Sequence, residues 1–409
     1  MTLKSSKVYA SLILLLGFTQ IACKASNRFN RGSGSTSTSF VAEAGFQLGN
    51  IAGAGDATQI FAGKFTNDVF PDVVVLTKAG GAYFYENNDG TGWNSRVSIT
   101  ITQGENYSAG VARDLDLDGL LDLALFLQST QLHTLRSNGD GTFSNFTTFN
   151  LAGISSGRTV NAMAMAPFVY ASDADPARNK AWIFAATSLG ESFYANQSLG
   201  NWTAGSLTSF SGTDYQPEDG TRVVATDFGG DNYQDFALMS RSAGRPIYLI
   251  RNTTDTSFSS VNTISPPSSA TNSDLISIDL EGDTKQDLLL ATSSGLQLYV
   301  NEGDYNFTES TKLRPATLGV NAISVLAADF TQDRNVDFFL TRDGANSVFY
   351  SQVNELIFEN QSSEAFQTGA LAESGVMAAS ADLDNDGDLD ILELFLDGSV
   401  NVYINQYEN

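Results

Sequence analysis

The sequence predicts an all-β chain folded as a seven-bladed β-propeller, and three observations lead to this prediction. An acidic nine-residue segment returns at intervals of about fifty residues, short apolar runs lie on both sides of each copy, and residues 40–48 resemble the one strand that the last repeat lacks. Runs of four to six apolar residues between turn formers favour strands over helices. Four strands per repeat, arranged around a ring, make a propeller, whose closure leaves only short protected edges.

The N-terminus is typical of an export signal. Lys4 and Lys7 precede an apolar run at 8–18, which suits the core of a signal peptide and is short for a membrane span. We therefore expect residues 1–22 to be removed and the remainder to be exported.

Residues 20–23, Gln-Ile-Ala-Cys, resemble a bacterial lipobox. This resemblance implies that Cys23 becomes the lipidated first residue of the mature chain; the alternative is an exported protein whose Cys23 carries no lipid. Residues 23–39 are rich in Ser, Gly, Thr and Asn, a composition typical of a flexible tether. We expect the folded body, 40–409, to be lipid-anchored at a bacterial cell envelope, at the outer membrane or cell surface.

The acidic segment organises the rest of the chain. It lies at 114–122, 227–235, 279–287, 329–337 and 382–390, with a weaker copy at 64–72. The interval between the copies at 114 and 227 is about twice the others, which predicts a degenerate seventh copy within 167–182.

Each repeat has the same order of predicted strands. A segment rich in small residues, such as 108–113, precedes the acidic segment, and a continuous apolar run, such as 123–127, follows it. An aromatic-rich third strand, such as 296–301, and a more polar fourth segment complete most repeats. The last repeat stops after its third strand, so we expect residues 40–48 to supply its fourth and to protect the exposed edge.

The acidic segment is also the candidate metal site. In 114–122, positions 1, 3, 5 and 9 are Asp114, Asp116, Asp118 and Asp122, and position 6 is glycine, which permits a sharp turn. Carboxylates brought together in this way raise one another's pKa or recruit a cation. Calcium accepts six to eight oxygen ligands, which matches four carboxylates and a backbone carbonyl, here that of Leu120.

The segment 382–390 repeats this pattern, and we expect calcium there as well. Its candidate ligands are Asp382, Asp384, Asp386, the Asp388 carbonyl and Asp390. Glu393 also completes an EF-hand loop pattern, but an EF-hand requires a helix on each side, and the flanking runs are short predicted strands.

The other three segments are degenerate, and extending the expectation to them gives up to five calcium ions. Their candidate ligands, in order, are Asp227, Asp231, Tyr233 (carbonyl) and Asp235; Asp279, Glu281, Asp283, Lys285 (carbonyl) and Asp287; Asp329, Thr331, Asp333, Asn335 (carbonyl) and Asp337. In the weak copy Lys64 replaces the first Asp, and no metal is expected there.

Composition narrows the possible functions. The chain has 22 Lys and Arg against 46 Asp and Glu, a formal charge of -24, which disfavours binding to nucleic acid because such binding depends on neutralising phosphates. One His and one Cys exclude disulfide frameworks and zinc sites built from several such ligands.

The pattern D-x-D-x-D-G-x-x-D followed by an apolar strand resembles FG-GAP and VCBS repeats, the units of integrin α-subunit propellers and of many bacterial surface proteins. The phrases at 138–143 and 299–307 resemble the closing phrase of VCBS units. The resemblance covers about 40–409 and implies structural metal loops on the face opposite the usual ligand surface. The Phe-Gly part of the family pattern is poorly represented.

Three functions remain open. The first is a non-enzymatic binding or scaffold module for a protein or glycan, with no catalytic residues, for which Tyr215 and Glu218 in the polar segment 211–220 are candidate contacts. The second is a polysaccharide-degrading enzyme, because related propellers include lyases. The third is an assembly factor for envelope proteins.

Overall fold

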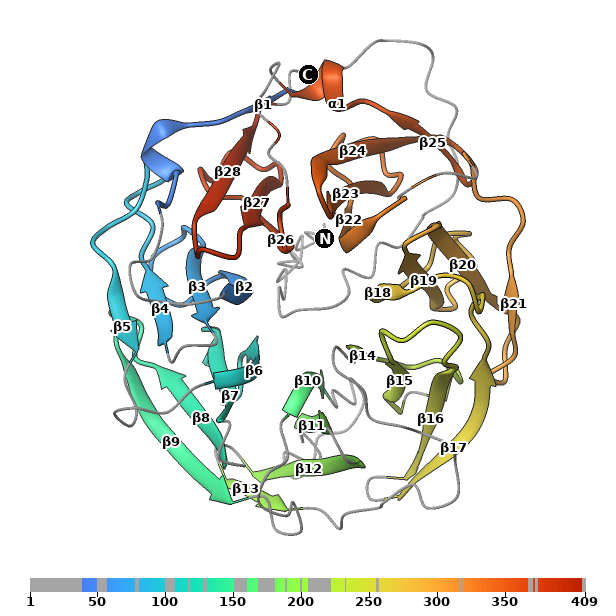
Figure 1. The fold of residues 1–409 in the computed structure, drawn as a ribbon. Coiled ribbons are helices and arrows are strands. Elements are labelled where there is room, and N and C mark those ends of the chain that lie inside the picture. The colour runs from blue at the N-terminus through green and yellow to red at the C-terminus, as the bar shows by residue number, and fades with distance from the viewer. Residues whose placement is uncertain are drawn as a thin grey trace, which may run out of the picture.

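The strands of the chain form a ring of radially arranged antiparallel sheets (Figure 1). The computed structural model describes residues 39–49, 57–77, 81–99, 107–116, 118–127, 131–150, 160–167, 181–187, 190–198, 201–204, 222–231, 233–254, 257–315, 318, 320–366, 371 and 374–406. Within these ranges there are seven four-stranded sheets. The all-β architecture agrees with the runs of apolar residues in the sequence.

Six sheets are each built from four consecutive strands. In chain order these strands are β2 to β5 (Ala57–Gly63, Asp72–Thr77, Gly81–Tyr85, Val97–Ile99), β6 to β9 (Tyr107–Arg113, Asp122–Leu127, Gln131–Ser137, Phe143–Asn150), β10 to β13 (Val160–Pro167, Ala181–Thr187, Gly190–Ser198, Asn201–Ala204), β14 to β17 (Arg222–Thr226, Asp235–Met239, Ile247–Thr254, Ser257–Ile264), β18 to β21 (Asn272–Ile278, Asp287–Thr292, Gly295–Asn301, Phe307–Glu309) and β22 to β25 (Ala322–Ala328, Asp337–Arg342, Ala345–Asn354, Ile357–Asn360).

The remaining sheet is a composite, and here the prediction of seven blades needs a correction. It joins β26 to β28 (Met377–Ala381, Asp390–Leu394, Val400–Asn405) to the N-terminal β1 (Phe40–Val41). In the described chain, six blades, not seven, are therefore complete and continuous in the sequence.

The N-terminal strand of the composite sheet is also shorter than expected. Residues 40–48 do not form one strand, because the 3-10 helix η1 (Ala44–Phe46) interrupts it. The Gln47 side-chain amide then donates to the Val402 carbonyl and accepts the Val402 N–H, as the backbone of a paired strand would. Leu48 forms an isolated antiparallel bridge with Val400.

The ring closes through its innermost strands. Each of β2, β6, β10, β14, β18 and β22 contacts the innermost strand of the next sheet, and β26 contacts β2. Small residues suit these crowded strands; the Ala-rich β26 and the Gly110 position of β6 are examples. A Cβ added at Gly110 would lie 2.7 Å from side chains of both Leu125 and Leu76.

The hydrophobic core lies between neighbouring sheets. The second residue of an acidic segment packs in this core. Phe65 contacts Phe84 and Phe143, and Phe228 contacts Phe307. Aromatic pairs of this kind contribute about 0.5–1.5 kcal/mol beyond their buried area. The single α-helix of the described residues, α1 (Ser362–Ala365), has four residues, and none there has the length and hydropathy that crossing a bilayer requires.

Candidate metal centre

Each of the six acidic segments from 64–72 to 382–390 connects the first two strands of its sheet, and its position-9 aspartate is the centre of a hydrogen-bond framework; the degenerate copy predicted within 167–182 falls at 168–180, outside the described residues. One oxygen of the position-9 aspartate accepts the backbone N–H of position 2, and the other accepts a backbone N–H from the end of the third strand, at 2.7–3.2 Å. These aspartates, at most 1% exposed, are Asp72, Asp122, Asp235, Asp287, Asp337 and Asp390. Their hydrogen bonds therefore tie three strands together.

Burial is the main influence on the position-9 carboxyl groups. It raises the pKa of Asp122 to about 7 and that of Asp390 to about 8, although two backbone N–H groups oppose the shift at each residue. A buried carboxylate of this kind is stabilised by a nearby cation, because the cation favours its charged form.

The loops share one backbone hydrogen bond, including those with degenerate sequences. The position-5 carboxylate accepts the N–H of position 7, as from Leu120 to Asp118 at 2.9 Å and from Asn335 to Asp333 at 2.8 Å. In four of the loops position 6 has a positive φ, at +91° in Gly119 and +99° in Gly387 but also at +75° in Thr284 and +71° in Arg334. A β-branched residue is strained there, so the fold imposes this conformation even where the sequence resists it.

Two groups of carboxylates among the described residues could hold a metal, and one of them lies in segment 382–390. Oxygens of Asp382, Asp384 and Asp390 all lie within 4.8 Å of one another. One oxygen of Asp384 is buried and has no hydrogen-bond partner. Burial and then the charges of Asp386 and Asp382 raise the pKa of Asp384 to about 6. This donor set fits a cation that prefers oxygen ligands.

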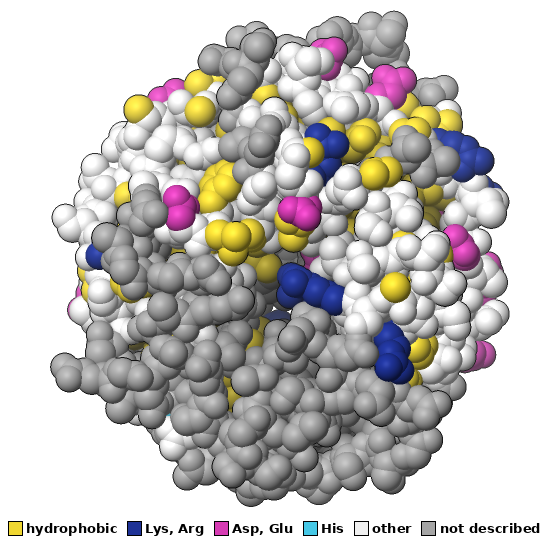
Figure 2. Space-filling model, viewed as in Figure 1, with side chains coloured by type: hydrophobic (Ala, Val, Ile, Leu, Met, Phe, Trp, Pro, Cys, Tyr) yellow, Lys and Arg dark blue, Asp and Glu magenta, His cyan; other side chains and the backbone are white. Residues whose placement is uncertain are grey.

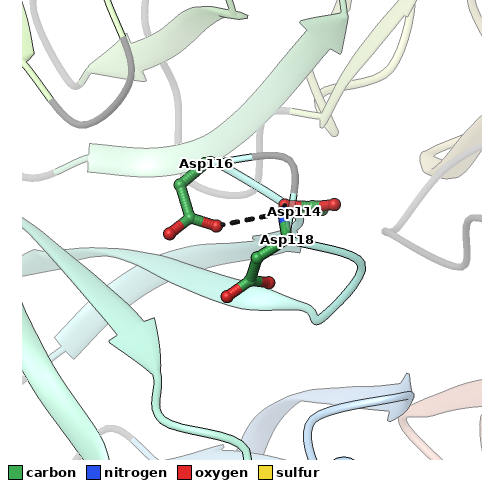
Figure 3. Close-up of side chains that lie close together, drawn as sticks. All are labelled: Asp114, Asp116 and Asp118. Carbon is green, nitrogen blue, oxygen red and sulfur yellow. Dashed lines mark hydrogen bonds between the residues drawn. The ribbon is translucent and has the colours of Figure 1, made fainter.

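The second group is Asp114, Asp116 and Asp118, whose oxygens also lie within 4.8 Å of one another. Figure 3 shows these side chains around the turn, with the Asp118 backbone N–H donating to Asp116. Arg136, from the end of β8, pairs with Asp116 at 2.8 Å and with Asp118 at 3.0 Å. A guanidinium thus competes for the carboxylates that calcium would bind, which the local pattern of the segment did not reveal.

In segment 227–235, two of the aspartates contact an arginine and a tyrosine of the protein itself. Asp231 pairs with Arg251 at 3.0 Å, and the Tyr305 hydroxyl of the next sheet donates to Asp235 at 2.9 Å. Tyr305 fills the space beside Gly229, where a Cβ would lie 2.6 Å from the hydroxyl oxygen. The aromatic residue of the neighbouring sheet therefore stands where the other segments have a position-3 side chain.

The last two degenerate segments also form other contacts. Asp283 pairs with Lys285 at 2.7 Å. Thr331 donates its hydroxyl proton to Asp337 at 3.0 Å, as Thr66 donates to Asp72 at 2.9 Å in the copy where no metal was predicted. In the described residues the carboxylates of segments 227–235, 279–287 and 329–337 do not gather into a compact group.

Sequence reasoning missed the asparagines that link neighbouring sheets. The Asn301 side chain donates to the carbonyls of Phe228 and Gln286, and Asn405 reaches Phe330 in the same way, at 3.0 Å. Asn87 donates to Leu383 at 2.8 Å and so joins the first continuous sheet to the composite sheet. The signal was an Asn at the end of the aromatic third strand, as in the phrases Tyr-Val-Asn and Tyr-Ile-Asn.

Glu393 is not part of the metal loop. Its fully buried side chain accepts hydrogen bonds from Ser347 and, at 2.8 Å, from the Tyr403 hydroxyl. The EF-hand alternative is therefore wrong, because the flanking segments β26 and β27 are strands. Cys23, Tyr215 and Glu218 lie outside the described residues.

The comparisons agree with this architecture. The family of FG-GAP-like repeats matches residues 64–125, 279–340 and 329–393. No curated protein sequence matches the chain. Among solved structures, BBS1N in complex with ARL6DN has 11% identity and a TM-score of 0.57, covering 89% of this chain and 98% of that chain. The BP39L lectin from Burkholderia pseudomallei has 13% identity and a TM-score of 0.55, covering 92% and 97%. The chain thus contains FG-GAP-like repeats, at 64–125 and 279–393, and its described strands are arranged as a β-propeller.

Proposed function

We propose that the chain is a calcium-stabilised, non-enzymatic binding module for a protein or glycan, anchored to a bacterial envelope membrane by a lipid on Cys23. The proposal combines a rigid ring of sheets with oxygen-rich loops on one of its faces. The lipid anchor rests on the sequence at 20–23 alone.

One observation carries the calcium part of the proposal. Asp384 has a buried oxygen without a hydrogen-bond partner, within 4.8 Å of oxygens of Asp382 and Asp390. An unsatisfied buried carboxylate oxygen costs about 1–3 kcal/mol or more, and an ion bound among the three side chains would remove that cost. All the donors are oxygens, which suits calcium and not a metal that prefers nitrogen or sulfur.

Segment 114–122 is the second proposed calcium site, with a weaker affinity. Calcium must displace Arg136 from Asp116 and Asp118 there, and each of these pairs lies at or below 3.0 Å. We assign no calcium to the three degenerate segments, because segments 227–235 and 279–287 pair a carboxylate with Arg251 or Lys285, and in 329–337 a threonine hydroxyl bonds the position-9 aspartate.

The binding role follows from the division of the fold into two faces. The acidic segments join first to second strands at one face, so the turns between second and third strands, such as 395–399, lie at the other. Structural metal loops would stiffen the ring from one side and leave the opposite face for a partner. The fold alone does not select the partner.

A binding screen tests the proposed function. The purified protein is incubated with a glycan array and with solubilised envelope proteins, in millimolar calcium and in excess EDTA, beside Asp384→Asn and the exposed control Asp304→Asn. We expect one defined partner to be retained in calcium, less by Asp384→Asn and equally by Asp304→Asn. Cleavage of a polysaccharide, or no retained partner under any condition, would contradict a non-enzymatic binding module.

A further inference from the structure

Two arginines lie together at the end of the fourth sheet that faces away from the metal loops. Arg222 begins β14, whose other end leads into the acidic segment 227–235. Arg222 pairs with Met239 across the sheet, and Arg241 follows Met239 by two residues, so both arginines occupy the same end of the sheet. The face drawn in Figure 2 has Lys and Arg side chains at the centre of the ring, near β14 in Figure 1.

Neighbouring strands hold this pair in place. The Arg222 Nε donates to Asp274 at 3.2 Å, and Asp274 is itself fixed by the backbone N–H groups of Leu275 at 3.0 Å and Val325 at 2.9 Å. The backbone N–H of Asn272 donates to the Arg241 carbonyl at 3.2 Å. The two arginines are thus attached to the sheets on both sides of one interface, close to the axis of the ring.

Among the described residues, the charge around the two arginines is not balanced. Two guanidinium groups share one carboxylate, that of Asp274, and in the described part of the chain the Arg241 guanidinium has no hydrogen-bond or ion-pair partner. Partial desolvation and then the adjacent charge of Arg222 lower the pKa of Arg241, while Asp274 raises it. Arg241 is nevertheless exposed, so a ligand can reach it. This excess of positive charge stands out in a chain with a formal charge of -24.

We propose that Arg222 and Arg241 form a binding site for an oxyanion, a carboxylate or sulfate group on a small ligand or sugar, at the centre of the face opposite the metal loops. Guanidinium groups match the planar fork of such anions and bind them through paired charge-assisted hydrogen bonds. Asp274 fixes Arg222 and leaves the pair with a net positive charge. This inference adds a ligand class to the proposed binding function. It rests on that function in one respect: it takes this face as the ligand surface.

The test is calorimetric titration of the full-length protein with sodium sulfate and with sodium galacturonate, in saturating calcium and at constant ionic strength, with galactose as the neutral probe. We expect saturable binding of at least one anion and none of galactose. Arg241→Gln should weaken that binding about tenfold or more, since it removes a charge-assisted donor. Arg342→Gln is the matched control, because Arg342 ends β23 at the same face and its side chain donates to the Asn346 carbonyl. The affinity of this variant should equal that of the native protein.

Binding of neither anion, or equal binding by Arg241→Gln and the native protein, would overturn the proposed site. Equal weakening by Arg342→Gln would do so as well, because it would reveal a general effect of surface charge. Melting curves recorded on the same samples separate this outcome from the calcium proposal: a protein that binds no oxyanion but melts higher in calcium loses the arginine site alone.

Discussion

A positive φ in the acidic loops strains residues other than glycine, and Thr284 is a clear example. It adopts φ +75° at the position where Gly119 and Gly387 stand in the two clusters of carboxylates. A left-handed conformation costs a non-glycine residue about 1–2 kcal/mol, while glycine adds some entropy to the unfolded chain.

We expect Thr284→Gly to increase the free energy of unfolding by about 0.5–1 kcal/mol, because the relief of backbone strain exceeds the added entropy. Urea denaturation in excess calcium measures the change. Thr292→Gly is the opposite control and should destabilise the protein, because Thr292 is buried at the end of β19 and its hydroxyl donates to the Gly295 carbonyl at 2.8 Å. A loss of stability in Thr284→Gly would mean that the side chain makes a contact worth more than the strain.

Arg136 acts as a competitor for calcium. Because it pairs with Asp116 and Asp118, its removal should free both carboxylates for the ion. We expect Arg136→Gln to raise the calcium affinity of the weaker site about threefold to tenfold, as judged by calorimetry. Arg251→Gln, which changes the equivalent arginine in a segment without a carboxylate cluster, should leave the calcium affinities unchanged. Equal or weaker binding by Arg136→Gln would contradict this competition.

Glu393 should make stability depend on pH. Burial raises its pKa from 4.5 to about 7, while hydrogen bonds from Ser347 and Tyr403 oppose the shift. The folded chain therefore holds a proton that the unfolded chain releases between about pH 4.5 and 7. The stability contributed by the neutral carboxyl is complete below pH 4.5 and is lost as the pH rises through 7.

Glutamine at this position stays neutral, so Glu393→Gln should match the native protein near pH 5 and exceed its free energy of unfolding by on the order of 2 kcal/mol at pH 8.5. Urea denaturation at the two pH values, both in saturating calcium, checks the prediction. A difference between the two proteins that does not change with pH would contradict it.

Among the elements, the third strands connect neighbouring sheets through residues at their ends, a role that the sequence pattern did not predict. Asn301 makes two hydrogen bonds to backbone carbonyls and accepts one from Gly303 at 3.0 Å, all within a buried site. Exposed Asn138, at the equivalent turn of another sheet, bonds mainly within its own loop.

We expect Asn301→Ala to lower the free energy of unfolding by about 2–3 kcal/mol, because it leaves two buried carbonyls without donors. Asn138→Ala should cost less than about 0.5 kcal/mol, since its partners can turn to water. Urea denaturation compares the two variants. Similar losses in both would show that the link between sheets contributes little.

The sequence predicted the positions of the strands well, but it did not predict the contacts between distant segments. Apolar runs and acidic segments are local signals, so predicted strands such as 123–127 match β7 closely. The link from Tyr305 to Asp235 joins residues 70 positions apart, which no local pattern contains. The prediction that residues 40–48 complete the last sheet is confirmed by the pairing of β1 with β28, but the strand is shorter than predicted. The helix η1 interrupts it, and the Gln47 side chain then bonds Val402, which hydrophobic alternation does not indicate.

For the whole molecule, the central claim is that a closed ring of sheets is stabilised by calcium among clustered aspartates. The position-9 aspartates and the inter-sheet asparagines link strands and sheets by hydrogen bonds, so we expect the proposed calcium to add stability to a ring that these bonds already connect. An ion that binds only the folded chain at one hundred times its dissociation constant adds about 2.7 kcal/mol per site.

The most direct test is the melting temperature of the purified protein in millimolar calcium and in excess EDTA, recorded for the native chain and for Asp384→Asn. We predict that calcium raises the melting temperature of the native protein by several degrees and that Asp384→Asn loses a large part of this gain. Identical melting temperatures in calcium and in EDTA, with no anomalous scattering from an ion at Asp384 or Asp114 in crystals grown with calcium, would contradict the central claim.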